Sequence, residues 1–281
     1  MIFLAYLFIS SLAWTLFDLA RKHLAHHEQP LALTVAFNVG ALPLYLGAWW
    51  LSSEQWAASD YWPPAFVAAI LAAIAAVGFI TALKLGDIAR VVPVLALTPI
   101  VSTVIAGFML EESLTLIQWC AMLITVVAIV GAQGGVSYIR GKPFVLMLMV
   151  SLCWGGGIVF DKLALRHSGP LFHGVVQTFC VAAVLVCFAF MAKRNITLQG
   201  AWYRLIPALF VFVLAVVMQW MALEEIDAGI VETVKRSIGI LGALIGGVLI
   251  FRERLKRSQI IWCVVILLCI PVILQPEVGL L

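Results

Sequence analysis

Lys235 and Arg236 are adjacent cations inside an apolar stretch that runs from Asp227 to Phe251 and is long enough to span a membrane. Charged side chains are costly in hydrocarbon, so such a pair is expected to face a polar cavity or an anion. The planar guanidinium can bind two oxygens at once, whereas the ammonium acts as a point charge. Together the two groups suit phosphate, phosphonate or carboxylate, and they predict a binding site for an anionic substrate.

Glu232 precedes this pair by three and four residues, which places the three side chains within reach of one another on a helix. An internal ion pair is therefore the alternative explanation, although one carboxylate neutralises only one of two cations. The two cations project about 100° apart, so both can address one ligand only where the helix borders a wide cavity. Glu232 could also bind a proton, or compete for the cations when substrate is absent.

The bilayer is the expected solvent of this chain. Hydrophobic residues make up 64% of its 281 residues and charged residues 11%, and its mean hydropathy is +1.12. A soluble domain of this size could not hide so much apolar surface from water. Ten apolar runs have about the length that crosses the hydrocarbon core as a helix. They lie near residues 2–21, 30–52, 64–84, 88–110, 114–133, 143–162, 170–192, 204–223, 228–251 and 258–275.

The two halves of the chain match when one is shifted by 140 positions. The matched positions are Ser11-Leu12, Trp14, Lys22, Pro30-Leu31, Ala82-Leu83, Asp87, Val91 and Gly107 with Ser151-Leu152, Trp154, Lys162, Pro170-Leu171, Ala222-Leu223, Asp227, Val231 and Gly247 and, after one inserted residue, Glu112-x-Leu114-x3-Gln118 with Glu253-x-Leu255-x3-Gln259. We therefore predict two five-helix repeats, residues 1–140 and 141–281. Because five is odd, the second repeat enters the membrane inverted, as in alternating-access carriers that bind substrate between their repeats.

This pattern resembles the ten-helix drug/metabolite transporter superfamily and its EamA-like members, which are built from two such repeats. The resemblance covers nearly the whole chain and rests on the matched positions together with Pro93 and Pro99. Val234-Lys235-Arg236 is similar to the lysine and arginine pair of the triose-phosphate and organophosphate branch. The resemblance implies an all-helical integral membrane protein with ten transmembrane helices in two inverted repeats. It also implies a transporter and not an enzyme.

Trp14 and Trp154 occupy equivalent positions in the middle of the first and sixth spans. An aromatic ring that faces the cavity could stack on a substrate, whereas one that does not is part of the packing. We take both tryptophans as candidate substrate-binding residues, together with Lys235, Arg236 and Glu232.

Asp18 in the first span and Lys22 directly after it, and Asp161 and Lys162 at the end of the sixth span, are candidates for gating or for charge pairing. Each aspartate has a basic neighbour along the chain, so a local pair or a side chain that reaches the interface is the simpler explanation. Because Lys22 and Lys162 are equivalent in the two repeats, a shared role in closing the two sides of the cavity is the alternative.

Two further patterns are expected to be structural. Small residues line the ninth span and glycines cluster in the sixth, and both stripes are expected to allow close helix packing. The two Glu-x-Leu-x3-Gln turns are expected to start the helices that follow them, since a carboxylate is favourable at a helix N-terminus. The stripes are Gly239, Gly242, Ala243, Gly246 and Gly247, and Gly155, Gly156 and Gly157.

Other classes of function find little support. All six cysteines lie inside spans, where a thiol behaves as a small hydrophobe, and His23, His26 and His27 lie in a basic loop. We therefore expect no metal and no cofactor. The sequence has neither G-x-S-x-G nor H-E-x-x-H, and a net charge of +3 gives no reason to expect nucleic-acid binding.

Basic residues concentrate in the connections after odd-numbered spans, which the positive-inside rule places in the cytoplasm. Both termini are then outside, whereas the resembled family usually has them inside. We predict a carrier in the inner or plasma membrane that moves a small anionic metabolite, phosphorylated or phosphonate-bearing, by alternating access. The alternatives are a flippase of a lipid-linked phosphate and an exporter of amino acids or other amphipathic metabolites. The expected partners are this substrate and the lipid bilayer, and a homodimer is a further option.

Overall fold

The computed structural model has helices as its only regular elements among the residues that it describes. These are residues 1–25, 28–85, 92–133, 141–198, 200, 202–251 and 256–275. The first half contains α1 (Ile2–Ala25), α2 (Pro30–Leu51), η1 (Ser59–Tyr61), α3 (Trp62–Leu85), η2 (Val92–Leu97), α5 (Thr98–Met109) and α6 (Leu116–Ala132). The second half contains α7 (Lys142–Leu165), α8 (Pro170–Met191), η3 (Trp202–Leu205), α9 (Ile206–Leu223), α10 (Ala228–Phe251) and α11 (Arg257–Ile273). The predicted all-helical fold with ten helices is confirmed.

The helices differ in how clearly they qualify as membrane spans. Within the described residues, six are long and apolar enough to cross a membrane by length and composition: α1, α2, α3, α7, α8 and α9. Helices α5, α6 and α11 are shorter and apolar. The predicted fourth span is divided, because η2 precedes α5 in the part of it that is described. Helix α10 has 24 residues and carries Glu232, Lys235 and Arg236.

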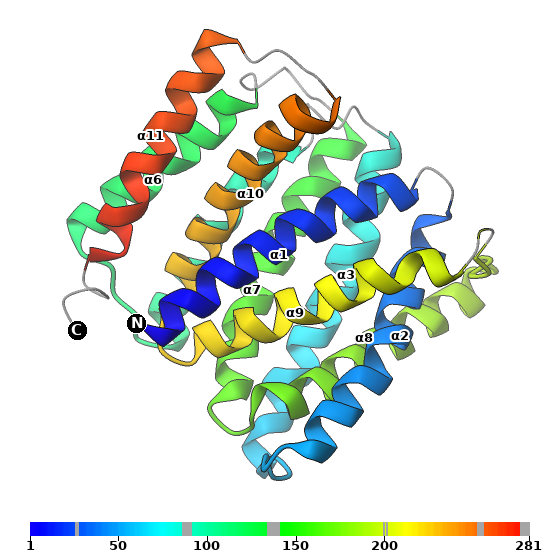
Figure 1. The fold of residues 1–281 in the computed structure, drawn as a ribbon. Coiled ribbons are helices and arrows are strands. Elements are labelled where there is room, and N and C mark those ends of the chain that lie inside the picture. Colours follow the sequence, from blue (N-terminus) through cyan, green and yellow to red (C-terminus); the bar gives the residue numbers. More distant parts are fainter. Residues whose placement is uncertain are drawn as a thin grey trace.

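Helices from the two halves pack against one another in a symmetric pattern. Helix α6 packs on α11 at one edge of the bundle, and α2 packs on α8 at the opposite edge (Figure 1). Between these pairs, α1 contacts α9 and α10, and α7 makes the equivalent contacts with α3 and α5. Exchanging the halves maps the pairs α6–α11 and α2–α8 onto themselves and the contacts of α1 onto those of α7, which is the arrangement that two related repeats produce.

Two glutamine side chains join α6 and α11 reciprocally. Gln118 Nε2, at the start of α6, donates to the carbonyl of Ile273 at the end of α11 over 2.9 Å. Gln259 Nε2, at the start of α11, donates to the carbonyl of Ala132 at the end of α6 over 3.0 Å. The two helices are therefore antiparallel. Because each is the last helix of its half, the second half runs inverted relative to the first, while the predicted boundary at residues 140 and 141 stays a prediction.

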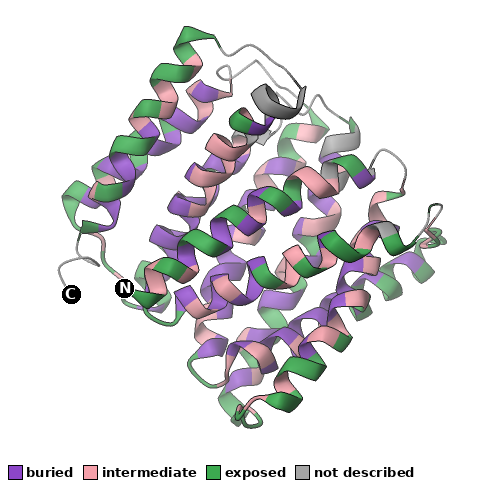
Figure 2. Ribbon diagram, viewed as in Figure 1, coloured by how far each residue is buried: buried purple, intermediate pink, exposed green. Residues whose placement is uncertain are grey.

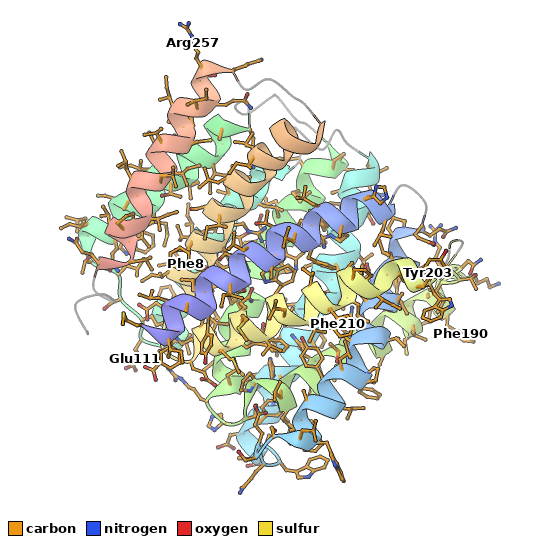
Figure 3. All side chains as sticks on the ribbon, in the orientation of Figure 1. Phe8, Glu111, Phe190, Tyr203, Phe210 and Arg257 are labelled. Atoms are coloured by element: carbon orange, nitrogen blue, oxygen red, sulfur yellow. The ribbon has the colours of Figure 1, made fainter. Side chains whose placement is uncertain are left out.

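The outer surface of the bundle is suited to lipid. Figure 2 shows exposed residues along the outward sides of the helices at both edges and buried residues where helices face one another. Many exposed residues are large and apolar, among them Phe8 on α1, Phe210 on α9 and Phe190 on α8 (Figure 3). Exposed apolar side chains carry no penalty when lipid hydrocarbon, and not water, surrounds the helices.

Helix α10 is closed in by other helices at its beginning and more accessible beyond its second turn. Every residue from 228 to 234 is buried. Lys235, Arg236 and most described positions from 238 to 245 are only partly buried or exposed. The two cations therefore lie at the border between the sealed and the accessible part of the helix.

Candidate functional site

Glu232 lies between the two cations of α10 and contacts both. Lys235 Nζ pairs with its Oε1, and Arg236 Nε lies 3.5 Å from its Oε2. The glutamate side chain is only 2% exposed. Because the carboxylate has two oxygens, it reaches both partners, which extends the single internal pair considered from the sequence. The three groups together carry one net positive charge.

Lys235 faces the first half-site, formed by α1 and α9. Its Nζ donates to Gln219 Oε1 over 3.0 Å, and the same oxygen accepts from Trp14 Nε1 over 2.9 Å. The ammonium also lies 5.7 Å from the centroid of the Trp14 ring, within cation–π range. The ring packs edge-on against Phe17 and Phe212, at centroid distances of 5.8 and 6.1 Å. These contacts fix the indole in one orientation.

Arg236 faces the second half-site, formed by α7, α3 and α1. Its guanidinium carbon lies 5.3 Å from the centroid of Trp154, whose ring lies 5.2 Å from that of Phe79. On the other side, the guanidinium carbon of Arg21 lies 4.6 Å from the centroid of Phe79. Two guanidinium groups from different helices therefore enclose a pair of aromatic rings.

The two half-sites are equivalent by the duplication. Trp14 and Trp154 are separated by the repeat shift of 140 residues, and so are Phe79 and Gln219. Adjacent side chains on α10 diverge by about 100°, so each cation reaches one half-site. The predicted set of Lys235, Arg236, Glu232 and both tryptophans is thus brought together in space.

Arg236 retains unused hydrogen-bonding capacity beside an open space. Its Nε is buried, and no group of the described residues accepts a hydrogen bond from it. One turn further along α10, a Cβ built on Gly239 would meet no described atom within 4 Å. By contrast, the same atom on Gly242 or Gly246 would meet side chains of α1. The predicted packing role therefore describes Gly242 and Gly246 and is wrong for Gly239.

The candidate gating residues have different partners. Asp18 pairs with Arg21 at 2.8 Å, which is the local charge pair that the sequence suggested. The side chain of Lys22 lies outside the described residues. Asp161 was expected to pair with its neighbour Lys162, but its Oδ1 instead bonds the side chains of His173 and Gln177 on α8, at 3.1 and 3.0 Å. Consecutive residues of a helix point in different directions, and this separates the two.

Lys162 joins α7 to the start of α10 through Glu112. Lys162 Nζ lies 2.7 Å from Glu112 Oε1 and donates to the carbonyl of Ile226 over 2.8 Å. Glu112 Oε2 accepts from the backbone N–H of Ala228 over 2.9 Å, so it caps the N-terminus of α10. The turn from Glu112 to Gln118 does start the helix that follows it, because Gln118 forms a capping box with Thr115 at the start of α6. The carboxylate of this turn does not take part, since Glu112 caps α10 instead. The equivalent Glu253 lies outside the described residues.

Sequence reasoning missed three members of the site: Gln219, Phe79 and Arg21. Gln219 lies near the end of a span, where a glutamine also suits the membrane interface, so its position alone does not mark it as part of a site. The available signal was the repeat shift, which pairs Gln219 with Phe79 beside the two tryptophans. As for metals, no group of three or more His, Cys, Asp or Glu side chains that could hold an ion occurs among the described residues. His26 and His27 lie outside them.

The sequence model of the EamA-like transporter family matches residues 1–132 and 141–275. The chain belongs to this family. The two matches correspond to two family repeats. This EamA-like transporter is thus a multi-pass membrane transporter of the drug/metabolite superfamily. The narrower resemblance to the triose-phosphate branch is not confirmed.

A solved structure titled only "Crystal structure of protein" shares the fold of this EamA-like transporter. The TM-score is 0.76 and the match covers 98% of this chain and 97% of the other, at 17% sequence identity. At that identity the likeness concerns the fold alone. No curated protein matches the chain.

Proposed function

We propose that this EamA-like transporter carries an organic anion by alternating access, with the anionic group bound by Lys235 and Arg236. The observation that supports this most directly is the buried Nε of Arg236, which makes no hydrogen bond with the described residues and lies beside the open space at Gly239. Its ion pair with Glu232 is long, at 3.5 Å, so an anion that fills the space would supply the hydrogen bond that this nitrogen lacks.

Glu232 supports the same proposal as a resident competitor for the cations. It contacts both cations, and an incoming anion would displace part of this contact without leaving either charge unpaired. Without substrate the carboxylate offsets one of the two cations, and a bound anion would offset the other. This is what a carrier needs, since a site that holds its substrate too tightly cannot release it.

The chemistry of the half-sites favours an anion with a carbon-rich body. A phosphate or phosphonate offers three oxygens to the guanidinium fork and the ammonium. Around them, Trp14, Trp154 and Phe79 present aromatic faces, and Gln219 is the uncharged polar side chain that bonds the cluster. We therefore propose an organophosphate or organophosphonate. The aromatic faces also favour amphipathic carboxylates as a second candidate class.

The structure is proposed to represent one access state. The link from Lys162 through Glu112 to Ala228 lies where α10 is completely buried, which supports a closed gate at this end. Beyond Arg236 the helix is more accessible, so substrate would enter from the opposite end. We propose that the protein works in the inner or plasma membrane. Its family and its short connections outside the membrane support this.

Thermal unfolding of the purified protein with phenylphosphonate, benzoate, inorganic phosphate and phenethylamine tests this proposal. A ligand at about a hundredfold its dissociation constant adds about 2.7 kcal/mol of stability, a measurable shift. The matched variant Glu232→Gln/Lys235→Met keeps the net charge of the cluster at one, supplied by Arg236, but removes the ammonium. We expect phenylphosphonate to stabilise the native protein and to bind the variant about tenfold more weakly, a loss of about 1.4 kcal/mol. Stabilisation by phenethylamine alone, or an equal response of the variant, would contradict the proposal.

A further inference from the structure

A second buried polar cluster lies outside the anion site, where α7, α8 and η1 meet. His173 is completely buried; its Nε2 lies 3.1 Å from Asp161 Oδ1 and its Nδ1 lies 2.9 Å from the Tyr61 hydroxyl. Gln177 Nε2 donates to the same aspartate oxygen over 3.0 Å. The Asp161 side chain remains 13% exposed, so the cluster is not completely sealed by the described residues.

We propose that Asp161 and His173 form a proton-binding site that couples transport to a proton gradient. In the unloaded state, His173 Nε2–H donates to Asp161 and the Tyr61 hydroxyl donates to Nδ1. The incoming proton binds Nδ1, which becomes a donor, and the Tyr61 oxygen becomes the acceptor. The Tyr61 hydroxyl keeps its own hydrogen, which turns away from the imidazole. The cluster gains a proton without losing a hydrogen bond.

The charge balance around the cluster favours this exchange. Unloaded, the cluster carries one negative charge, and the proton neutralises it. Lys162, the nearest cation along the chain, is held by Glu112 on another side of α7. Among the described residues, Tyr45 of α2 and Cys180 of α8 are further ionisable groups that face the cluster.

Glu54 of the connection before η1 adds a further negative charge at this end. It accepts hydrogen bonds from the backbone N–H groups of Leu171 and Phe172, at 3.2 and 2.8 Å, directly before His173. Asp161 itself has no cationic partner among the described residues unless His173 is protonated. An unpaired charge is costly at such a place, so a proton is the natural counter-ion.

The cluster is connected to the anion site by two helices. The imidazole of His173 lies 4.6 Å from the Trp220 ring, and the preceding residue, Gln219, bonds Lys235. On α7, Asp161 follows Trp154 by two turns, and its neighbour Lys162 holds the start of α10. A change of charge at the cluster thus acts on elements that also position the cations and the closed end of α10.

The cluster breaks the symmetry of the fold. A hydrogen-bond network needed only to hold each repeat together would be expected in both. The first-half equivalents of Asp161, His173 and Gln177 under the shift of 140 are Arg21, Leu33 and Phe37, which cannot form it. The protein therefore has this proton site in one repeat, on one side of the bundle.

Proton binding can be measured without any substrate by nitrogen-15 NMR of full-length protein labelled at its five histidines. The resonance lost in His173→Gln belongs to His173, and His167→Gln, in an exposed position, is the matched control. We expect the His173 resonance to move from its neutral to its protonated position as the sample is taken from about pH 8 to about pH 5, a window chosen for histidine. A resonance that stays neutral, or stays charged, throughout this range overturns the proton site.

Coupling is tested in proteoliposomes with phenylphosphonate, and only this step rests on the proposed function. One pH unit drives about tenfold accumulation per coupled proton, since 1.4 kcal/mol corresponds to a factor of ten. We expect His173→Gln and Asp161→Asn to lower the ratio of gradient-driven accumulation to exchange by about this factor, and His167→Gln to leave it unchanged. An unaltered ratio overturns coupling. If the native protein does not move phenylphosphonate, the proposed substrate fails while the NMR titration still decides the proton site.

Discussion

Glu232 and the proposed substrate use the same two cations. The carboxylate is almost completely buried and touches an ammonium on one side and a guanidinium on the other. Without it, two positive charges would stand unpaired on one helix in a protein whose surroundings are hydrocarbon. At this residue, stability in the absence of substrate and affinity for substrate are therefore opposed.

Replacement of this carboxylate makes the opposition measurable. We expect Glu232→Gln to lower the stability of the ligand-free protein by about 3–5 kcal/mol, because a buried pair is broken. The stabilisation by phenylphosphonate should become larger than in the native protein, since the anion no longer competes with a resident carboxylate. Denaturant unfolding with and without the compound gives both quantities. An unchanged ligand effect would show that Glu232 does not occupy the site of the anion.

Gly239 offers a test that leaves every charge in place. A leucine there would fill the open space next to Arg236, so we expect Gly239→Leu to fold normally and to lose at least tenfold in phenylphosphonate affinity, about 1.4 kcal/mol. Gly47→Leu is the matched control, because a Cβ on Gly47 also meets nothing within 4 Å and the residue lies on the exposed side of α2. Calorimetric titration compares the two, and equal affinities would place the anion elsewhere.

At the scale of elements, the start of α10 is fixed by contacts from two other parts of the chain. Lys162 comes from the end of α7 and Glu112 from the connection between α5 and α6. Both side chains are 11% exposed, so their contact is largely protected from solvent. To open this end of the bundle, the protein must separate these groups or move them together.

A double-mutant cycle measures what this contact contributes. We expect Glu112→Gln and Lys162→Met each to destabilise the protein, with a coupling free energy of about 1–3 kcal/mol, because the two side chains contact one another directly. Unfolding of the native protein, both single variants and the double variant in denaturant supplies the four values. Additive effects would mean that the groups do not cooperate in holding α10.

Asp227 makes the same region sensitive to pH. Burial and Glu112 raise the pKa of this carboxyl, and Lys162 opposes them. Because the folded-state pKa is the higher one, the protonated form favours folding, and this contribution is lost as pH rises through that pKa. We expect Asp227→Asn to raise the unfolding temperature at neutral pH, and the gain to vanish below about pH 4, where aspartate is protonated in both states. A gain that is the same at every pH would contradict this.

The repeating features of the sequence predicted the elements well, and the specific contacts of the site much less. Apolar runs and the repeat shift locate the ten helices, because a helix that crosses hydrocarbon needs a continuous run of apolar residues. Lys235, Arg236 and Glu232 stand out because charge is rare in hydrocarbon. Gln219 and His173 carry no such signal, because their partners lie on other helices and depend on how the bundle packs. The same reason explains why neither the partners of Asp161 nor the helix that Glu112 caps could be predicted.

At the scale of the whole molecule, the two ends of the bundle carry opposite charge. The end at which α1 begins and α11 ends (Figure 1) is acidic in the connections that the structure describes, and the other end is basic. The acidic residues are Glu54, Asp60, Glu111, Glu112, Glu224, Glu225 and Asp227, and the basic ones are Lys142, Lys193, Arg194, Lys256 and Arg257. From this distribution, the positive-inside rule predicts that the basic end faces the cytoplasm.

Labelling of single cysteines decides the orientation. In a background without Cys120 and Cys187, which are exposed, we expect Asp60→Cys to react with a membrane-impermeant maleimide in intact cells. Lys193→Cys, at the basic end, should react only after permeabilisation. The reverse pattern would place both termini in the cytoplasm, as the resembled family suggests.

The position of both cations on α10 also bears on how such a protein could arise by duplication. The first-half counterparts of Lys235 and Arg236 are Leu95 and Ala96. An assembly of two identical five-helix chains would carry the pair twice and place four cations around one axis in hydrocarbon, with strong mutual repulsion. Joining the halves into a single gene product allows one copy to acquire charge while its twin stays apolar. Fusion of the two halves therefore allows an anion site with a single pair of cations in a scaffold that is otherwise symmetric.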